Sequence, residues 1–87
     1  MDKTMTVVET SLFSVLRKFP GRRDRIMRLF REREDFRTIC EDYEKCLMSL
    51  RHWSASKTEE ATERREEYSD MASDLESEIS KSLEEEE

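Results

Sequence analysis

The sequence has very few of the residues that interrupt helices. Among its 87 residues are one glycine and one proline, the residue types that most often mark turns. Sustained alternation of β-branched and polar residues, which is typical of strands, is also absent. Glutamate, arginine, leucine and methionine, which favour helices, are abundant instead. We therefore predict an all-α protein.

Long apolar runs and cysteines are also scarce. No run of about 18 apolar residues could form a membrane span, and the start of the sequence lacks the basic and apolar regions of a secretory signal. Two cysteines are too few for a disulfide scaffold. We expect a cytoplasmic protein with free thiols and no membrane contact.

The composition leaves little material for a core. Hydrophobic residues make up 34% of the chain and charged residues 44%, with a net charge of −6. A chain of this size buries only about 60 to 65% of its unfolded surface. Catalytic carboxylates need a closed pocket to shift their pKa, and this chain has little apolar area to build one. We expect one small domain over residues 1–87, with no catalytic, cofactor-binding or metal-binding residues, and not an enzyme.

Apolar residues at helical spacing predict a first helix over residues 7–18. Thr6 and Glu9 match a capping box at its start. Pro20 and Gly21 end it, because the residue before a proline is pushed out of the α region. Its apolar stripe comprises Val8, Leu12, Val15, Leu16 and Phe19.

Two further helices are predicted over residues 21–31 and 36–53. Ile26, Leu29 and Phe30 point roughly 100° away from the stripe that begins at Phe36, so the apolar face rotates between the two segments. Asp35 could cap the later helix. We therefore expect a break or kink between Arg31 and Asp35.

A last helix is predicted over residues 57–83. Ser56 and Glu59 repeat the capping-box pattern at its start. The connection from residue 53 is short, so the helices on its two sides should form an antiparallel hairpin packed like a coiled coil. The acidic tail, residues 84–87, opposes the helix dipole and should fray unless arginines hold it.

Charge is divided unevenly between the two halves of the chain. Residues 1–57 contain 13 Lys/Arg and 9 Asp/Glu, a net charge of +4, whereas residues 58–87 contain 3 and 13, a net charge of −10. In an antiparallel hairpin the basic patch would lie near the acidic tail, and the two could neutralise each other. This patch comprises Arg22, Arg23, Arg25 and Arg28.

The basic segment also suggests nucleic-acid binding as an alternative function. Residues 17–37 carry 9 Lys/Arg against 4 Asp/Glu, with three phenylalanines among them. Basic helices bind phosphate backbones. The acidity of the whole chain, with a pI of about 4.9, opposes this reading because its field repels nucleic acid.

A thiol or metal sensor is the second alternative, using Cys40, Cys46 and His52. The cysteines lie six residues apart, so on one helix they point about 240° apart and cannot chelate one metal together. Both lie on the apolar stripe, where cysteine is commonly a small packing residue. We expect packing rather than reactivity.

The run from Phe36 to Tyr43, Phe-Arg-Thr-Ile-Cys-Glu-Asp-Tyr, carries a resemblance to known proteins together with Leu50, Trp53 and Tyr68. It is similar to a group of small bacterial helical proteins with a Phe-Arg-x-Ile/Leu-Cys-x-Asp-Tyr step, over residues 19–83. The resemblance implies a bacterial helical hairpin. It implies no activity, cofactor or binding residue.

The number of apolar stripes points to an interaction or assembly module. One antiparallel pair of helices satisfies only two stripes, so the others need cover. They can fold back over their own hairpin or cross to a second chain, and we favour a homodimer. The residues concerned are Val8, Leu12, Val15, Leu16, Phe19, Ile26, Leu29 and Phe30.

Overall fold

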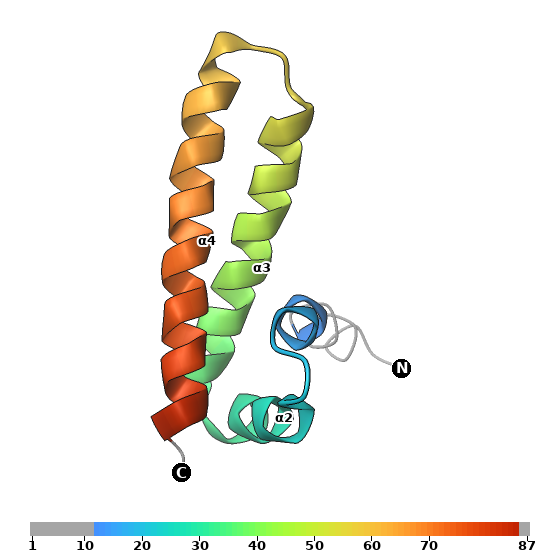
Figure 1. The fold of residues 1–87 in the computed structure, drawn as a ribbon, viewed down its shortest axis with the longest axis vertical. Helices are drawn as coiled ribbons and strands as arrows, with labels where there is room; N and C mark the ends of the chain where they lie inside the picture. Colours follow the sequence, from blue (N-terminus) through green and yellow to red (C-terminus); the bar gives the residue numbers. More distant parts are fainter. Residues whose placement is uncertain (1–11, 86–87) are drawn as a thin grey trace.

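The computed structural model describes residues 12–85, and all regular structure among them is helical (Figure 1). Residues 12–18 are helical, followed by α2 (Arg23–Glu32), α3 (Glu34–Ala55) and α4 (Glu59–Glu85). The prediction of an all-α protein is confirmed for this part of the chain. Thr6, Val8, Glu9, the start of the predicted first helix and residues 86–87 of the acidic tail lie outside the described residues.

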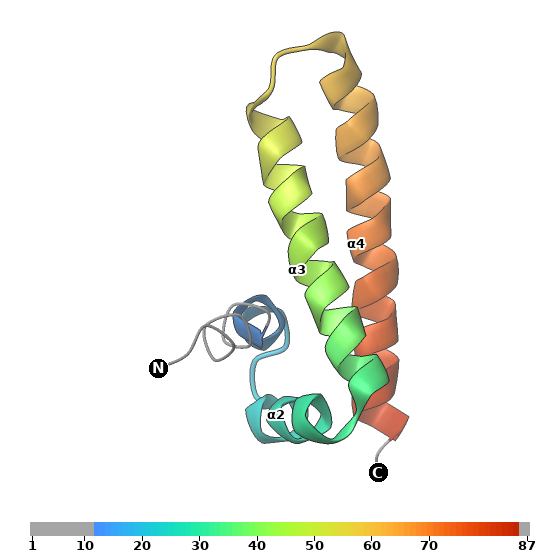
Figure 2. The ribbon, with the colours of Figure 1, turned by 180° about the vertical axis from the view of Figure 1, so that it is seen from behind.

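The two long helices, α3 and α4, pack side by side and run in opposite directions (Figures 1 and 2). Their register follows from two hydrogen bonds. The Cys46 thiol donates to the Tyr68 carbonyl at 3.1 Å, and the Tyr43 hydroxyl donates to the Glu76 carboxylate at 2.7 Å. Later residues of α3 therefore lie beside earlier residues of α4, which makes the pair antiparallel.

The two shorter helical pieces cover one end of this pair. Helix α2 lies across the foot of α3, and residues 12–18 cross the flank of α3 above it (Figures 1 and 2). Between them the chain turns at Pro20 and Gly21, where Gly21 has a φ of +88° that side chains rarely adopt. This turn brings the first apolar stripe back over the chain's own helices.

One core unites all four helical segments. Residues 12–18 supply Leu12 and Val15, and Leu16 and Phe19 pack against the cluster from its edge. The buried residues of the other helices are Ile26, Leu29, Phe30, Phe36, Cys40, Tyr43, Cys46, Ala72, Ile79 and Leu83. A helix of only 10 residues such as α2 is marginal alone in water, so this shared burial holds it in place.

The break between α2 and α3 lies at Arg33, which has extended backbone angles of φ −124° and ψ 116°. Helix α3 therefore begins two residues earlier than predicted, and the cap role expected for Asp35 is wrong. Asp35 lies in the first turn, where its carboxylate accepts from the Phe36 amide at 2.9 Å and pairs with Arg33 at 3.1 Å. The hydrogen bond from Arg33 lowers the pKa of Asp35.

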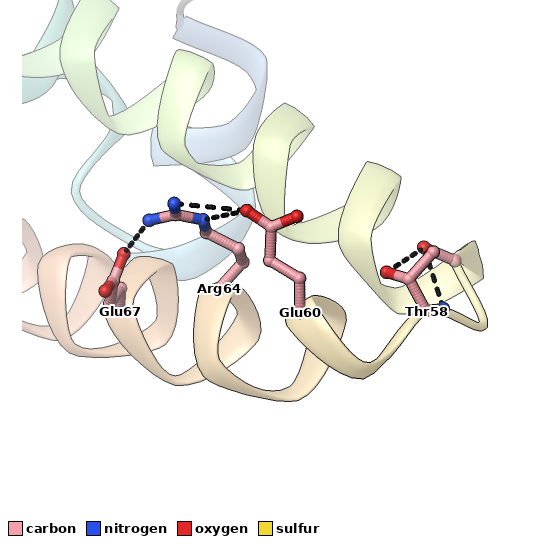
Figure 3. Close-up of polar contacts among 5 residues, drawn as sticks. Thr58, Glu60, Arg64 and Glu67 are labelled. Carbon is pink, nitrogen blue, oxygen red and sulfur yellow. Dashed lines mark hydrogen bonds and ion pairs between the residues drawn. The ribbon is translucent and has the colours of Figure 1, made fainter.

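The turn between α3 and α4 also differs in detail from the capping box expected of Ser56 and Glu59. The Ser56 hydroxyl accepts from the Thr58 amide at 3.3 Å and lies 3.1 Å from the Thr58 hydroxyl (Figure 3). Helix α3 runs on to Ala55, and α4 begins at Glu59 rather than at residue 57. The serine thus stabilises a local turn.

The foot of the hairpin brings the basic and acidic ends of the chain together. Helix α4 continues through Glu84 and Glu85, so these residues do not form the separate tail predicted from residue 84. The Arg22 guanidinium donates to the Leu83 carbonyl at 3.1 Å. A cation that binds the last carbonyls of a helix offsets the negative end of its dipole.

Replacing Arg22 with alanine should therefore destabilise the fold. We expect a loss of about 1 to 2 kcal/mol, the usual range for a charge-assisted hydrogen bond in a partly buried position. Urea unfolding followed by circular dichroism measures the change. Arg23→Ala is the matched control, because Arg23 is exposed on the same helix. Equal losses in the two variants would contradict the capping role.

Candidate functional site

The apolar residues proposed from sequence as an interaction face lie inside the chain where the structure describes them, which excludes Val8. Val15, Ile26 and Leu29 are fully buried, and Leu12 and Phe30 are nearly so. Leu16 and Phe19 are partly buried against the same core. Of the two courses that the sequence leaves open for these stripes, the structure has the first, because α2 and residues 12–18 fold back onto the foot of their own hairpin. This set is therefore not an exposed contact surface in the folded chain.

One large apolar residue of α4 is exposed. Met71 has 49% of its surface accessible, whereas the Ala72 beside it is buried. The stripe of α4 passes through Ala61, Tyr68, Ala72, Leu75 and Ile79, and Met71 lies at its margin. Adjacent positions on a helix point about 100° apart, so Met71 is turned away from the core that Ala72 faces.

The basic patch is brought together on and beside α2. Arg23 and Arg28 are exposed, whereas Arg22 and Arg25 are half-buried. Two open hollows of about 520 and 510 Å³ flank the helix. They are lined by Gly21, Arg22, Arg23, Asp24, Arg25, Met27, Arg28 and Arg31. The surface at this end of the molecule is therefore rich in guanidinium groups.

The two thiols are packing groups in this structure. Both are free and buried, and desolvation raises the pKa of the Cys40 thiol to about 12 and also raises the pKa of Cys46. A thiol with a raised pKa is a poor nucleophile and a poor metal ligand at neutral pH. His52 is exposed near the hairpin tip, with its ring edge-on to Trp53 at 5.0 Å. Residues 12–85 contain no cluster of three His, Cys, Asp or Glu that could hold a metal ion.

A polar cross-link that sequence reasoning missed joins three helical segments. Glu76 of α4 accepts from the Tyr43 hydroxyl of α3 at 2.7 Å and pairs with Lys18 at 3.6 Å. Ser14 donates to Glu44 beside it. Desolvation, followed by the bond to Glu76, raises the pKa of Tyr43. Tyr43 and Glu76 are 33 residues apart, so only the hairpin register could have indicated this contact.

The outer face of α4 carries a straight line of carboxylates. Glu59, Glu63, Glu66 and Asp70 follow one another at spacings of four, three and four residues, and all are exposed. We call these four residues the acidic stripe. Nothing within residues 12–85 forms an ion pair with them.

Two carboxylates beside the acidic stripe, unlike those of the stripe, form ion pairs with an arginine. Arg64 pairs with Glu60 at 3.2 Å and with Glu67 at 2.9 Å, so both of these carboxylates are satisfied within the helix (Figure 3). The hydrogen bonds that Arg64 donates to Glu67 and Glu60 raise its pKa. The stripe carboxylates have no such partner within residues 12–85, and neither do Asp74, Glu78, Glu84 and Glu85 further along α4.

A hollow of about 550 Å³ borders the acidic stripe on the flank of the hairpin. It is lined by Leu50, Thr62, Arg65, Glu66, Ser69 and Asp70. Two of these are stripe carboxylates, and Leu50 supplies apolar surface. A lysine or arginine buries its aliphatic stem on apolar surface while its charged end stays near carboxylates and water. The Arg65 guanidinium also lines the hollow, where it donates to the Trp53 carbonyl and the Thr62 hydroxyl, so the two carboxylates outnumber the cations of the lining by one.

None of the helices in the described part of the chain is both long and apolar enough to cross a membrane. Comparisons with protein families, with curated proteins and with solved structures find no match to this chain. The resemblance to small bacterial helical proteins stays a prediction.

Removing the Tyr43 hydroxyl should weaken the cross-link. Tyr43→Phe leaves Glu76 with only Lys18 and should cost about 1 kcal/mol of unfolding free energy, typical for one buried hydrogen bond. Tyr68→Phe is the matched control, because no hydrogen bond of its hydroxyl is found within residues 12–85. Urea titrations of both variants decide the matter. A smaller loss for Tyr43→Phe than for Tyr68→Phe would contradict the assignment.

Both thiols should react slowly in the native protein. At pH 8 we expect labelling by a disulfide reagent to be about a hundredfold slower than in urea, because the raised pKa of Cys40 and Cys46 reduces the thiolate fraction. The folded-state pKa exceeds the ordinary value of 9.0, so the buried Cys40 thiol stabilises the fold below about pH 9, and this contribution is lost towards pH 12. Fast native labelling of both thiols would contradict their packing role and favour a sensor.

Proposed function

We propose that this chain is a protein-interaction module, built as a helical hairpin with two short N-terminal helices, that binds its partner through charged surface. The observation that carries the proposal is that most apolar residues pack into one core, while the surface is strongly acidic along one helix. Residues 59–85 hold 11 Asp/Glu and 3 Lys/Arg, a net charge of −8. The apolar stripes face one shared core.

The acidic stripe is the surface that we propose contacts the partner, because binding there would reduce the repulsion between its carboxylates. Like charges three and four residues apart on a helix destabilise it by about 0.2 to 0.5 kcal/mol per pair. Glu59, Glu63, Glu66 and Asp70 form three such pairs in succession. A basic segment laid along α4 relieves this repulsion and gains from electrostatic steering during association.

The hollow beside the acidic stripe offers a binding position for one side chain of the partner. A lysine or arginine from the partner fits its stem against Leu50 and its charge against Glu66 and Asp70. The partner chemistry proposed is therefore a basic protein segment with one deeply seated cation. A location in the cytoplasm, where such partners are common, belongs to the same proposal.

A second copy of the chain is one source of basic surface, through Arg23 and Arg31 of α2, which are both exposed. The homodimer expected from the sequence would then form through charged faces rather than through Leu12, Val15 and their neighbours. Such a dimer should dissociate as salt rises, because exposed charges are screened. Sedimentation equilibrium distinguishes 10.5 kDa from twice that mass.

Nucleic-acid binding through the same arginines is a second candidate. Its supporting observation is the exposure of Arg23, Arg28 and Arg31 on one short helix beside two open hollows. The acidic face of α4 opposes it, since the field of that helix repels phosphates. Fluorescence anisotropy with single-stranded and duplex DNA and RNA, repeated at several salt concentrations, tests this candidate.

Neutralising the acidic stripe should abolish partner capture. The variant Glu59→Gln, Glu63→Gln, Glu66→Gln, Asp70→Asn removes four charges and should also melt slightly higher, because it removes repulsion. The control Glu32→Gln, Asp42→Asn, Glu78→Gln, Glu84→Gln removes four exposed charges elsewhere. Affinity capture from the source cell is compared for the wild type and both variants.

The expected result is a specific protein held by the wild type and by the control but lost from the stripe variant. A stripe variant that captures the same proteins as the control would contradict the proposal. So would a wild type that captures only nucleic acid.

A further inference from the structure

A groove of about 330 Å³ lies between residues 14–18 and α3. Its lining combines positive charge, hydroxyl groups and one aliphatic side chain. The residues are Ser14, Arg17, Lys18, Tyr43, Leu47 and Arg51. Its two walls come from different helices, so it exists only because the N-terminal helix folds back over the hairpin.

Of the two carboxylates near the groove, Glu76 is paired with a cation, whereas Glu44 has only a hydroxyl donor and keeps its charge. Glu76 binds the Tyr43 hydroxyl at 2.7 Å and Lys18 at 3.6 Å, and Glu44 accepts from Ser14. The remaining cations, Arg17 and Arg51, form no ion pair with any residue in the described range. The Arg17 guanidinium instead lies over the Phe13 ring at 5.6 Å from its centroid. Each wall therefore presents one guanidinium group whose charge is not neutralised.

We propose that this groove binds a small phosphate monoester. A guanidinium group donates paired hydrogen bonds that match phosphate oxygens, and a phosphate dianion offers enough oxygens for both Arg17 and Arg51. The volume exceeds that of a phosphate group alone, and Leu47 supplies apolar surface for the organic part of the ligand. The site is independent of the acidic stripe and uses none of its residues.

Binding there couples the ligand to the fold. Arg17 belongs to the N-terminal helical segment and Arg51 to α3. A phosphate held by both groups cross-links the two elements and adds to the contacts of Ser14 and Lys18. The ligand should therefore raise the melting temperature as well as bind.

Phenyl phosphate is the test ligand, with phenol and inorganic phosphate as the two partial probes. Titration of the isotope-labelled full chain, followed by amide shifts, should give saturable changes confined to residues 14–18 and 43–51. Arg17→Gln and Arg51→Gln should each raise the Kd about tenfold, as expected for the loss of one charge-assisted interaction. Arg23→Gln is the control, since it removes the same charge from an exposed site on α2.

Four results would overturn the assignment. They are no saturable binding in the low millimolar range, shifts spread equally over the arginines of α2, an Arg23→Gln effect as large as that of Arg51→Gln, and inorganic phosphate or phenol binding as tightly as the ester. Circular dichroism of each variant shows whether a weaker Kd reflects lost folding. Should Arg51→Gln unfold, Arg51→Lys replaces it, because a lysine keeps the charge but loses the paired donors.

Discussion

The scarcity of apolar side chains is the constraint on which the rest of this structure depends. Only 34% of the residues are hydrophobic, so the helices share most of their apolar residues in one core, and the large ones left exposed within residues 12–85 are Phe13, Met48 and Met71. Residues 12–18, α2, α3 and α4 therefore pool their stripes in one cluster near the foot of the hairpin. The Pro20–Gly21 turn and the break at Arg33 make this possible, because they direct residues 12–18 and α2 onto the same core.

The exterior follows from that use of the interior. Because the apolar residues of α2 and α4 pack into the core, the exposed faces of these two helices differ from each other mainly in charge. Arginines gather beside the C-terminal end of α4, where Arg22 binds the Leu83 carbonyl. Carboxylates line the outer face of α4, where Arg64 satisfies Glu60 and Glu67 but leaves the acidic stripe alone. The proposed partner surface arises from this separation of charge, whereas the proposed phosphate groove arises from the packing of residues 14–18 against α3.

Much of the helical content could be predicted from sequence, because the signals are local. The lack of glycine and proline predicts helix throughout, and the rotation of the apolar phase after Phe30 predicts a break near Arg33. Exact boundaries were less accessible. Asp35 resembles an N-cap residue in sequence, but Arg33, whose backbone is extended, is the N-cap of α3. Asp35 lies in the first turn of the helix, where its carboxylate accepts from the Phe36 amide.

The candidate sites were harder to predict because they depend on tertiary register. The stripe at Leu12 and Val15 was visible, but its burial depends on how the chain turns at Gly21. The contact of Tyr43, Glu76 and Lys18 joins three segments far apart in sequence. The acidic stripe, by contrast, is visible in the spacing of Glu59, Glu63, Glu66 and Asp70, although acidic runs of this kind are usually solvated faces.

The central claim is that each chain covers its own N-terminal apolar stripe. Isotope-filtered NOE spectra of a sample that mixes labelled and unlabelled chains test it most directly, with the Val15 methyl groups as the reporter. The account predicts that Val15 contacts core protons of α3 only within one chain, so that the filtered spectrum is empty at those positions. NOEs between the Val15 methyls of one chain and the core of another would contradict it.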